Sequence, residues 1–229
     1  MKKIVVLAVF LLFFFVTKGD ALDYSKEREG MIKDQIISRG VKNSKVIAAM
    51  QKVERHLFVP FLLRWRAYED GPLPIGHGQT ISQPYIVAFM TEALELTSDD
   101  IVLEIGTGSG YQAAVLAEIA KEVYTIEILK PLVDQANERL IELGYKNIKV
   151  KHGDGYLGWP EHAPFNKIIV TAAPDAIPME LVNQLKVGSK MVIPIGSISQ
   201  ELYLITKTQD GFTKKAILPV RFVPMLKGE

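Results

Sequence analysis

The sequence predicts an α/β fold of the Rossmann type, with a mostly parallel, doubly wound sheet. Two observations indicate this fold. Between residues 101 and 195, short apolar runs alternate with amphipathic segments at helical spacing, which is the order of βαβ units. A glycine-rich segment also follows the first apolar run and opens the next helix, as ligand-binding loops do in such sheets. We expect helices before this sheet and an antiparallel hairpin after it.

The N-terminal part is expected to be helical. Apolar spacing predicts a helix over residues 23–39, ended by Gly40, and a second over 44–53, capped by Asn43. Residues 68–83 hold two prolines and three glycines, so a loop is expected there. Pro84 suits the first turn of a further helix, with Ser82 or Gln83 as its cap.

In the sheet region, alternation and length separate strands from helices. The expected strands are 101–105, 123–128, 148–151, 165–171 and 191–195. The expected helices are 111–120, 131–143 and 179–185. Strands at 202–208 and 212–219 flank Asp210 and Gly211, a hairpin signal.

Composition narrows the function. The formal net charge of +1 gives no general attraction to nucleic acid, so we expect no nucleic-acid partner. The chain has no cysteine, which excludes disulfides, thiolate metal sites and a cysteine nucleophile. Four histidines without acidic partners at ligand spacing predict no metal site. We expect a monomer.

The first 21 residues look like a leader. Lys2 and Lys3 precede an apolar run over residues 4–16, and residues 17–21 turn polar and small. This pattern is typical of a secretory signal or anchor, and the run is short for a membrane span of about 20 residues. Residues 22–229 are then expected to form one domain.

The glycine-rich segment predicts a nucleotide-like ligand. Gly106, Gly108 and Gly110 let the backbone turn tightly and a ligand approach closely. Glu127, at the end of the next expected strand, is suited to accept from ribose hydroxyls. A tight strand-to-helix turn without a ligand and a dinucleotide site are the alternatives.

Spacing and further acids favour S-adenosylmethionine as the cofactor. The glycines follow Gly-x-Gly-x-Gly, whereas dinucleotide sites use Gly-x-Gly-x-x-Gly. Glu104 would place a carboxylate beneath the loop, near the ligand's ammonium group. Asp154 follows the third strand and is suited to accept from an adenine amino group. Glu127 or Asp154 alone is more simply interpreted as an exposed carboxylate.

The methyl acceptor is expected to be a good nucleophile. Thr171 and its neighbours after the fourth strand lack the Asn/Asp-Pro-Pro-Tyr/Phe pattern of enzymes that methylate amino groups. They also lack the carboxylates of a metal-dependent site, and no cysteine is available for covalent catalysis. A carboxylate, with a reference pKa of about 4, is ionised at neutral pH and needs no general base.

Five segments resemble the signatures of the protein-L-isoaspartate O-methyltransferase family, in the family's order. They are residues 73–85, 102–112, 152–155, 169–174 and 220–224. The resemblance covers residues 24–229, and its most family-specific part runs from Gln79 to Pro84. It implies the class I methyltransferase fold, S-adenosylmethionine as methyl donor, and damaged proteins with isoaspartyl residues as partners.

The resemblance also implies a reaction and a set of residues. The family methylates the free α-carboxylate of L-isoaspartyl residues and of some D-aspartyl residues. The ester is a better leaving group than the carboxylate, so the next backbone nitrogen closes a succinimide, whose hydrolysis regenerates some normal aspartate. Ser82 is the implied active-site residue, and Ser82, Arg221 and Val223 are the implied substrate contacts. The expected cofactor contacts are Thr80, Gln83, Glu104, Gly106, Thr107, Gly108, Gly110, Glu127, Asp154 and Gly155.

Ser82 is expected to orient the acceptor and not to act as a base. A serine hydroxyl without a histidine partner is a poor base, whereas orientation contributes strongly to a two-reactant step. A helix N-cap is the structural alternative for Ser82, and a terminal strand is the alternative for residues 221–224. A nucleotide-dependent oxidoreductase and a non-catalytic binding module remain as competing functions. The usual location of the family and the cytosolic synthesis of S-adenosylmethionine predict a cytoplasmic protein. The sequence of residues 1–21 instead predicts an exported or membrane-tethered protein.

Overall fold

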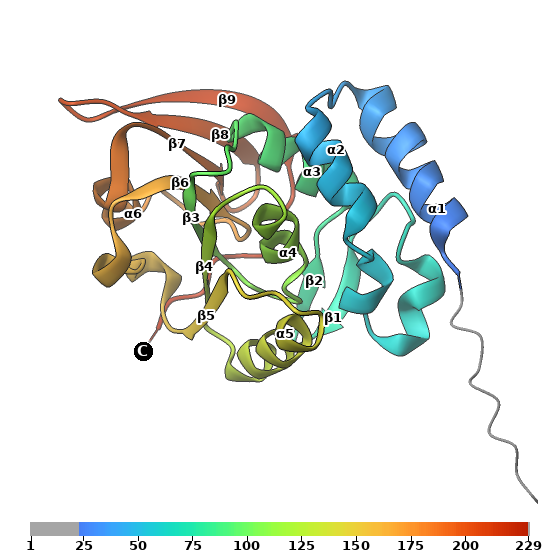
Figure 1. Ribbon diagram of the computed structural model, residues 1–229. Helices are drawn as coiled ribbons and strands as arrows, with labels where there is room; N and C mark the ends of the chain where they lie inside the picture. The colour runs from blue at the N-terminus through green and yellow to red at the C-terminus, as the bar shows by residue number, and fades with distance from the viewer. Residues whose placement is uncertain (1–22, 229) are drawn as a thin grey trace, which may run out of the picture.

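The computed structural model describes residues 23–228. A seven-stranded sheet with the order β5-β4-β3-β6-β7-β8-β9 forms the centre of the molecule (Figure 1). Strands β5 to β7 run parallel, and β8 and β9 continue the sheet in antiparallel pairing. The strands are β3 (Ile101–Ile105), β4 (Glu122–Glu127), β5 (Ile148–His152), β6 (Phe165–Val170), β7 (Leu185–Ile195), β8 (Gln200–Lys207) and β9 (Phe212–Val220). The predicted fold class is confirmed.

Alternation along the strands creates two cores, one on each face of the sheet. Val102 packs into one core and Leu103 into the other, because successive side chains of a strand point to opposite faces. Helices that precede β5 in the chain cover the first face and α6 (Met179–Gln184) covers the second, so the sheet is doubly wound. The helices of the first face include α2 (Ser44–Lys52), α3 (Pro84–Ala93), α4 (Tyr111–Ala117) and α5 (Lys130–Glu142).

The first predicted helix begins at Ser25, two residues later than predicted, and is helical from there to Arg39 but not uniform. It consists of α1 (Ser25–Gly30), a π-helical turn η1 (Met31–Ile36) and a 3₁₀ turn η2 (Ile37–Arg39). Gly40 ends it with φ 95°, as predicted for a left-handed C-cap. Asn43 caps α2 by accepting from two backbone N–H groups, which confirms the second boundary.

The predicted loop over residues 68–83 is wrong in part, because it contains a hairpin. Strands β1 (Leu73–Gly76) and β2 (Gln79–Ile81) pair antiparallel. Leu73 and Ile75 alternate with exposed residues and are buried, whereas Gly76, His77 and Gly78 all have positive φ and make the turn. The high glycine and proline content obscured the alternating pattern of the first strand, which contains only two buried residues.

Other boundaries shift by a few residues. Strand β7 begins at Leu185, six residues before the predicted start, because Leu185 pairs with Phe165 at the beginning of β6. Residues 186–190 contain no apolar run, so the sequence gives no local indication of this earlier start of the strand. The predicted helix over 111–120 ends at Ala117. The Asp210–Gly211 turn joins β8 to β9, as predicted.

Short 3₁₀ turns connect the larger elements. They are η3 (Arg55–Phe58), η4 (Phe61–Arg66), η5 (Gly155–Leu157) and η6 (Pro160–His162). Across residues 23–228, no helix combines the length and apolar character needed to cross a bilayer. The predicted leader over residues 1–21 lies outside the described residues.

Candidate active site

The glycine segment forms a tight loop at the carboxyl end of β3. Gly106, Gly108 and Gly110 all have positive φ, at 97°, 52° and 86°, which L side chains rarely adopt. The Gly106 N–H donates to the carbonyl of Ile126 at 2.8 Å, so the loop is fixed to the neighbouring strand β4. Gly110 precedes α4 and packs against Leu140 of α5.

Glu104 lies fully buried beneath this loop. Its Oε2 accepts from the Thr125 hydroxyl at 2.5 Å, and the Thr107 hydroxyl lies 2.7 Å from the same Thr125 oxygen. Because Thr125 has one proton and gives it to Glu104, Thr107 is the donor in the second bond. Burial raises the pKa of Glu104 to about 8, and the negative charge of Glu127 acts in the same direction.

One oxygen of Glu104 has no protein partner. Oε1 is buried without a hydrogen bond among the described residues. A buried acceptor of this kind costs free energy unless a donor reaches it. A cationic donor that enters the site would satisfy it and favour the ionised carboxylate.

Glu127 ends β4 and joins two parts of the site. Its Oε2 accepts from the Gly108 N–H at 2.9 Å, and its Oε1 accepts from the Leu129 N–H at 3.0 Å. The side chain is nearly buried. Two backbone donors therefore hold the carboxylate beside the glycine loop.

Asp154 is engaged locally. Its Oδ1 accepts from the Tyr156 N–H at 2.8 Å and caps η5, and its Oδ2 accepts from the Gly228 N–H at 3.0 Å. A β-carbon on Gly155 would lie 2.3 Å from Ile105 Cγ2. Only glycine therefore allows the loop after β5 to lie this close to the end of β3.

These elements enclose a pocket at the carboxyl ends of the parallel strands. It contains about 570 Å³ of space, part of it open to solvent. Five residues predicted to bind the cofactor line it: Thr80, Gly106, Gly108, Glu127 and Gly155. Among the other predicted contacts, Thr107 lines a small adjoining cavity and Gln83 lines a different pocket. Glu104 and Gly110 support the loop from below and behind.

A second pocket adjoins the first. It contains about 1510 Å³ of space, part of it open to solvent. Ser82, Arg221 and Val223, the three predicted substrate contacts, all line it. Four residues line both pockets and mark where they meet: Thr80, Thr171, Val223 and Pro224.

Ser82 is not the N-cap of α3. That position belongs to Gln83, whose side chain makes no capping bond. The Ser82 hydroxyl has no hydrogen-bond partner within residues 23–228. Gln83 instead donates to Asp70 at 2.6 Å, and Asp70 pairs with Arg39.

The segment after β9 forms one wall of the second pocket. Strand β9 ends at Val220, so residues 221–224 do not continue it as a terminal strand. Gln200 accepts from the Phe222 N–H at 2.6 Å and donates to the Phe222 carbonyl at 3.1 Å. Ala173 bonds both to Val223 and to Met225 through backbone groups at 2.8 Å. The chain end is thereby fixed across the strand edge.

Sequence reasoning did not assign Thr171 to the site. It follows β6, lines both pockets, and its hydroxyl lies 2.8 Å from the Gly106 carbonyl and 3.0 Å from that of Ile105. The signal was present, because Thr171 is the first residue after the fourth strand. Met225 and Leu226 of the C-terminal segment also line the first pocket; no local pattern announces them.

The residues fit S-adenosylmethionine. The buried, unpartnered Glu104 oxygen matches a ligand that carries an ammonium group, and Glu127 at a strand end matches a ribose. The positive-φ glycines leave the loop backbone bare on the side of the pocket. Within residues 23–228, no group of His, Cys, Asp and Glu side chains is arranged to hold a metal ion.

Comparison with known proteins gives a consistent result. The family model for "Protein-L-isoaspartate(D-aspartate) O-methyltransferase (PCMT)" matches residues 26–229. A protein-L-isoaspartate O-methyltransferase of Synechococcus sp. is 57% identical over 216 residues, which cover 90% of this chain and 88% of the relative. One of Dictyoglomus thermophilum is 53% identical, over 93% of this chain and 96% of the relative.

Solved structures agree with the sequence relatives. A structure titled protein-L-isoaspartate O-methyltransferase superposes with a TM-score of 0.79 at 30% identity, over 86% of this chain and 65% of that chain. A putative one from Plasmodium falciparum, in complex with S-adenosyl-L-homocysteine, superposes with a TM-score of 0.75 at 27% identity, over 90% of this chain and 99% of that chain. The fold is thus that of a class I methyltransferase, and the chain belongs to the protein-L-isoaspartate(D-aspartate) O-methyltransferase family.

Proposed function

We propose that the two adjoining pockets divide the reaction between them, with the cofactor in the first and the isoaspartyl carboxylate in the second. The reaction itself is that of the family: the chain methylates the α-carboxylate of L-isoaspartyl residues and takes the methyl group from S-adenosylmethionine. The observation that carries the division is the shared boundary. Thr80, Thr171 and Val223 line both pockets, so ligands in the two pockets would meet there.

The cofactor pocket would hold its ligand mainly through the backbone of the glycine loop and through the carboxylates of Glu127 and Glu104. Glu127 is preset by the Gly108 and Leu129 N–H groups and would accept from ribose hydroxyls. Glu104 would compensate the ligand's ammonium group, directly or through the loop. Bound S-adenosylmethionine supplies an electrophilic methyl group. Because these groups are positioned before the ligand arrives, little reorganisation opposes the transfer.

Ser82 would orient the acceptor carboxylate. Its hydroxyl has no partner within the described part of the chain and lines the second pocket, so it is free to donate to a carboxylate oxygen. The exposed cation of Arg221 lies in the same wall and would attract the negatively charged residue. No general base is needed, because the acceptor is already ionised. Thr171 does not serve as one, because its hydroxyl faces two backbone carbonyls.

Binding measurements distinguish this proposal from its competitors. Calorimetry with S-adenosylhomocysteine and with NAD should give saturable binding of the first only. Tight NAD binding without S-adenosylhomocysteine binding would favour an oxidoreductase. A non-catalytic module would bind an isoaspartyl peptide without turnover and equally well as S82A.

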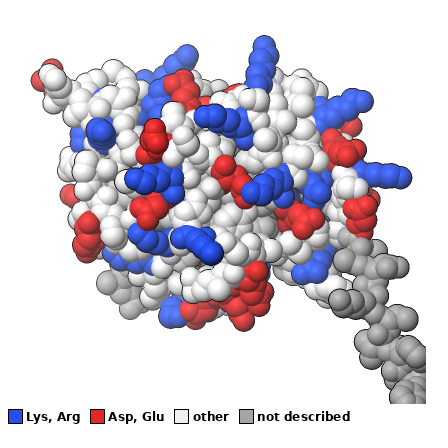
Figure 2. Space-filling view, in the orientation of Figure 1, with Lys and Arg blue, Asp and Glu red and all other residues white. Residues whose placement is uncertain are grey.

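We further infer a monomeric enzyme that acts in the cytoplasm on damaged proteins and binds no nucleic acid. All predicted site residues come from one chain, and S-adenosylmethionine is made in the cytosol. Acidic and basic side chains are interspersed over the visible face, without a large region of one sign (Figure 2). The alternative, indicated by the leader-like sequence of residues 1–21, is that the protein is exported or tethered to a membrane.

A further inference from the structure

The short helix η4 carries an exposed apolar surface. Phe61, Leu62 and Trp65 are 75%, 81% and 68% exposed. Adjacent large apolar side chains at this exposure are unusual on a freely soluble face, and contiguous patches of this kind mark interaction sites. We call these three residues the η4 patch. None of them lines the cofactor or the substrate pocket.

Arginines border the η4 patch in a specific geometry. The Arg64 guanidinium lies over the Phe61 ring at 5.4 Å, and that of Arg66 lies over the Trp65 ring at 5.6 Å. Arg66 is also paired with Glu69 at 2.8 Å. Tryptophan and arginine together are typical of the lipid–water boundary, where one end of a side chain is apolar and the other stays in water.

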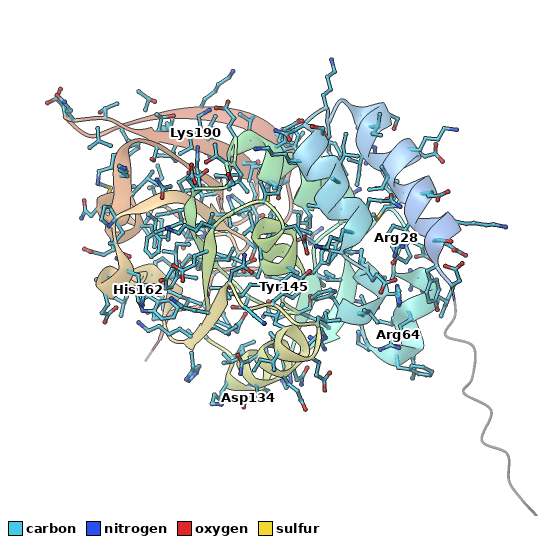
Figure 3. All side chains as sticks on the ribbon, viewed as in Figure 1. Arg28, Arg64, Asp134, Tyr145, His162 and Lys190 are labelled. Atoms are coloured by element: carbon cyan, nitrogen blue, oxygen red, sulfur yellow. The ribbon has the colours of Figure 1, made fainter. Side chains whose placement is uncertain are left out.

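The described chain begins beside the patch-bearing segment. The Tyr24 ring packs on His56 of η3 with centroids 4.6 Å apart and lies 6.0 Å from Tyr68, which follows η4. Arg28 is paired with Glu54 at 3.2 Å. Figure 3 shows Arg28 and Arg64 on the side of the molecule where the chain enters α1. The start of the described chain therefore lies beside η3 and beside Tyr68, which follows η4.

The sequence before that point is apolar. Residues 4–16 are all apolar, and seven residues separate them from Tyr24. Seven residues span at most about 25 Å, which limits the length of chain between this run and Tyr24. Thirteen residues reach about 20 Å as a helix, less than the roughly 30 Å of a bilayer core. A short apolar insertion holds a protein on a membrane weakly unless a second contact assists it.

We propose that the η4 patch is this second contact: Phe61, Leu62 and Trp65 insert into the interfacial layer of the lipid bilayer that the apolar sequence of residues 4–16 also binds. Arg64 and Arg66 stay at the level of the headgroups. The enzyme is then held on a membrane by two attachments, and the η4 patch lines neither of its two pockets. The proposal does not depend on the methyl-transfer reaction.

Vesicle binding by the full chain tests the proposal. Intact protein, with Met1 verified by mass spectrometry, is sedimented with vesicles of phosphatidylcholine alone and of phosphatidylcholine with phosphatidylglycerol. We expect binding to both, stronger to the anionic vesicles. The F61S/L62S/W65S variant should bind at least about tenfold more weakly, and so should protein that begins at Asp23.

A fluorescence measurement places the patch directly. The chain has two tryptophans, so W159F leaves Trp65 as the only reporter. Its emission should shift to the blue with vesicles and be quenched by lipids labelled near the headgroup. The matched control is M179S/V187S/I198S, which removes three other exposed apolar side chains and should bind like the wild type.

Either of two results would overturn the proposal. One is unchanged vesicle binding by F61S/L62S/W65S, with no shift of Trp65 emission. The other is a lipid-independent dimer that this variant dissociates, which would make a second copy of the chain the occupant of the patch. The F61S/L62S/W65S variant should methylate a soluble isoaspartyl peptide at a rate within twofold of wild type. This activity would show that the variant has folded.

Discussion

The Thr171 hydroxyl oxygen lies 2.4 Å from the position that a β-carbon on Gly106 would occupy. The same hydroxyl lies within hydrogen-bond distance of the Gly106 carbonyl, at 2.8 Å. The ends of β3 and β6 therefore approach so closely that only glycine fits at the start of the loop. This contact sets the shape of the cofactor pocket where it meets the substrate pocket.

Replacement of Gly106 by alanine should disrupt cofactor binding. The φ of 97° already disfavours an L side chain, at about 1–2 kcal/mol, and the contact with Thr171 forces the loop or β6 to move. We expect S-adenosylhomocysteine affinity to fall at least tenfold, measured by calorimetry. Gly40→Ala is the matched control, because its φ is 95° and nothing lies within 4 Å of the new carbon. It should lose only the stability that the positive φ costs and keep its affinity; equal affinity loss in both variants would contradict this account.

The buried Glu104 should make stability depend on pH. Its pKa is raised to about 8 in the folded protein, above the value of about 4.3 in an unfolded chain. Between these values the folded state binds more protons, so the free energy of unfolding should fall as pH rises from about 5 to about 8. The fall is on the order of a few kcal/mol. Glu104→Gln should flatten it.

Chemical denaturation at several pH values checks this dependence. The exposed Glu138→Gln serves as the control and should keep the wild-type slope. Saturating S-adenosylhomocysteine should also reduce the slope, because its ammonium favours the ionised carboxylate. A slope that survives in Glu104→Gln would assign the dependence to another group.

Removal of the Ser82 hydroxyl should impair transfer without impairing cofactor binding. An orienting hydrogen bond to the acceptor contributes about 1.5–3 kcal/mol when one partner is charged, so Ser82→Ala should lower kcat/KM by roughly tenfold to a hundredfold. The shape of the pH–rate profile should not change, because Ser82 is not a base. The exposed Ser98→Ala should match the wild type. Loss of an ionisation from the profile would instead indicate a proton-transfer role.

The side chain of Gln200 should support substrate binding from a distance. It makes two hydrogen bonds to the backbone of Phe222, beside Arg221 and Val223. Gln200→Ala should raise the peptide KM several-fold and lower stability by about 1–3 kcal/mol. Gln184→Ala removes an equivalent pair of bonds, to Leu157 and Trp159. It should lose similar stability and leave the peptide KM unchanged, so a rise in both would show only general loosening.

Local patterns in the sequence predicted much of the fold and the outline of the pocket. The parallel strand order brings the ends of consecutive strands to one sheet edge, which is why Glu127 and the Gly108 N–H meet at 2.9 Å. Gly40 and Asn43 were predictable as helix boundaries because capping depends on a few neighbouring residues.

Features that depend on residues far apart in the chain were not predictable. Asp154 is engaged by Gly228, 74 residues away, and Gln83 faces Asp70 in place of the cofactor pocket. The β1–β2 hairpin depends on the burial of Leu73 and Ile81 by the N-terminal helices. Arg55 is fully buried with its guanidinium 4.9 Å from the Tyr111 ring centre, and burial lowers its pKa to about 10. No local pattern indicates such a residue.

Transfer of a labelled methyl group tests the central claim most directly. Wild-type protein is incubated with S-adenosylmethionine and either an isoaspartyl peptide or the same peptide with normal aspartate. The account predicts base-labile methyl ester on the isoaspartyl peptide and none above background on its aspartyl counterpart. Equal labelling of the two peptides, or no labelling of either by folded protein that binds S-adenosylhomocysteine, would contradict it.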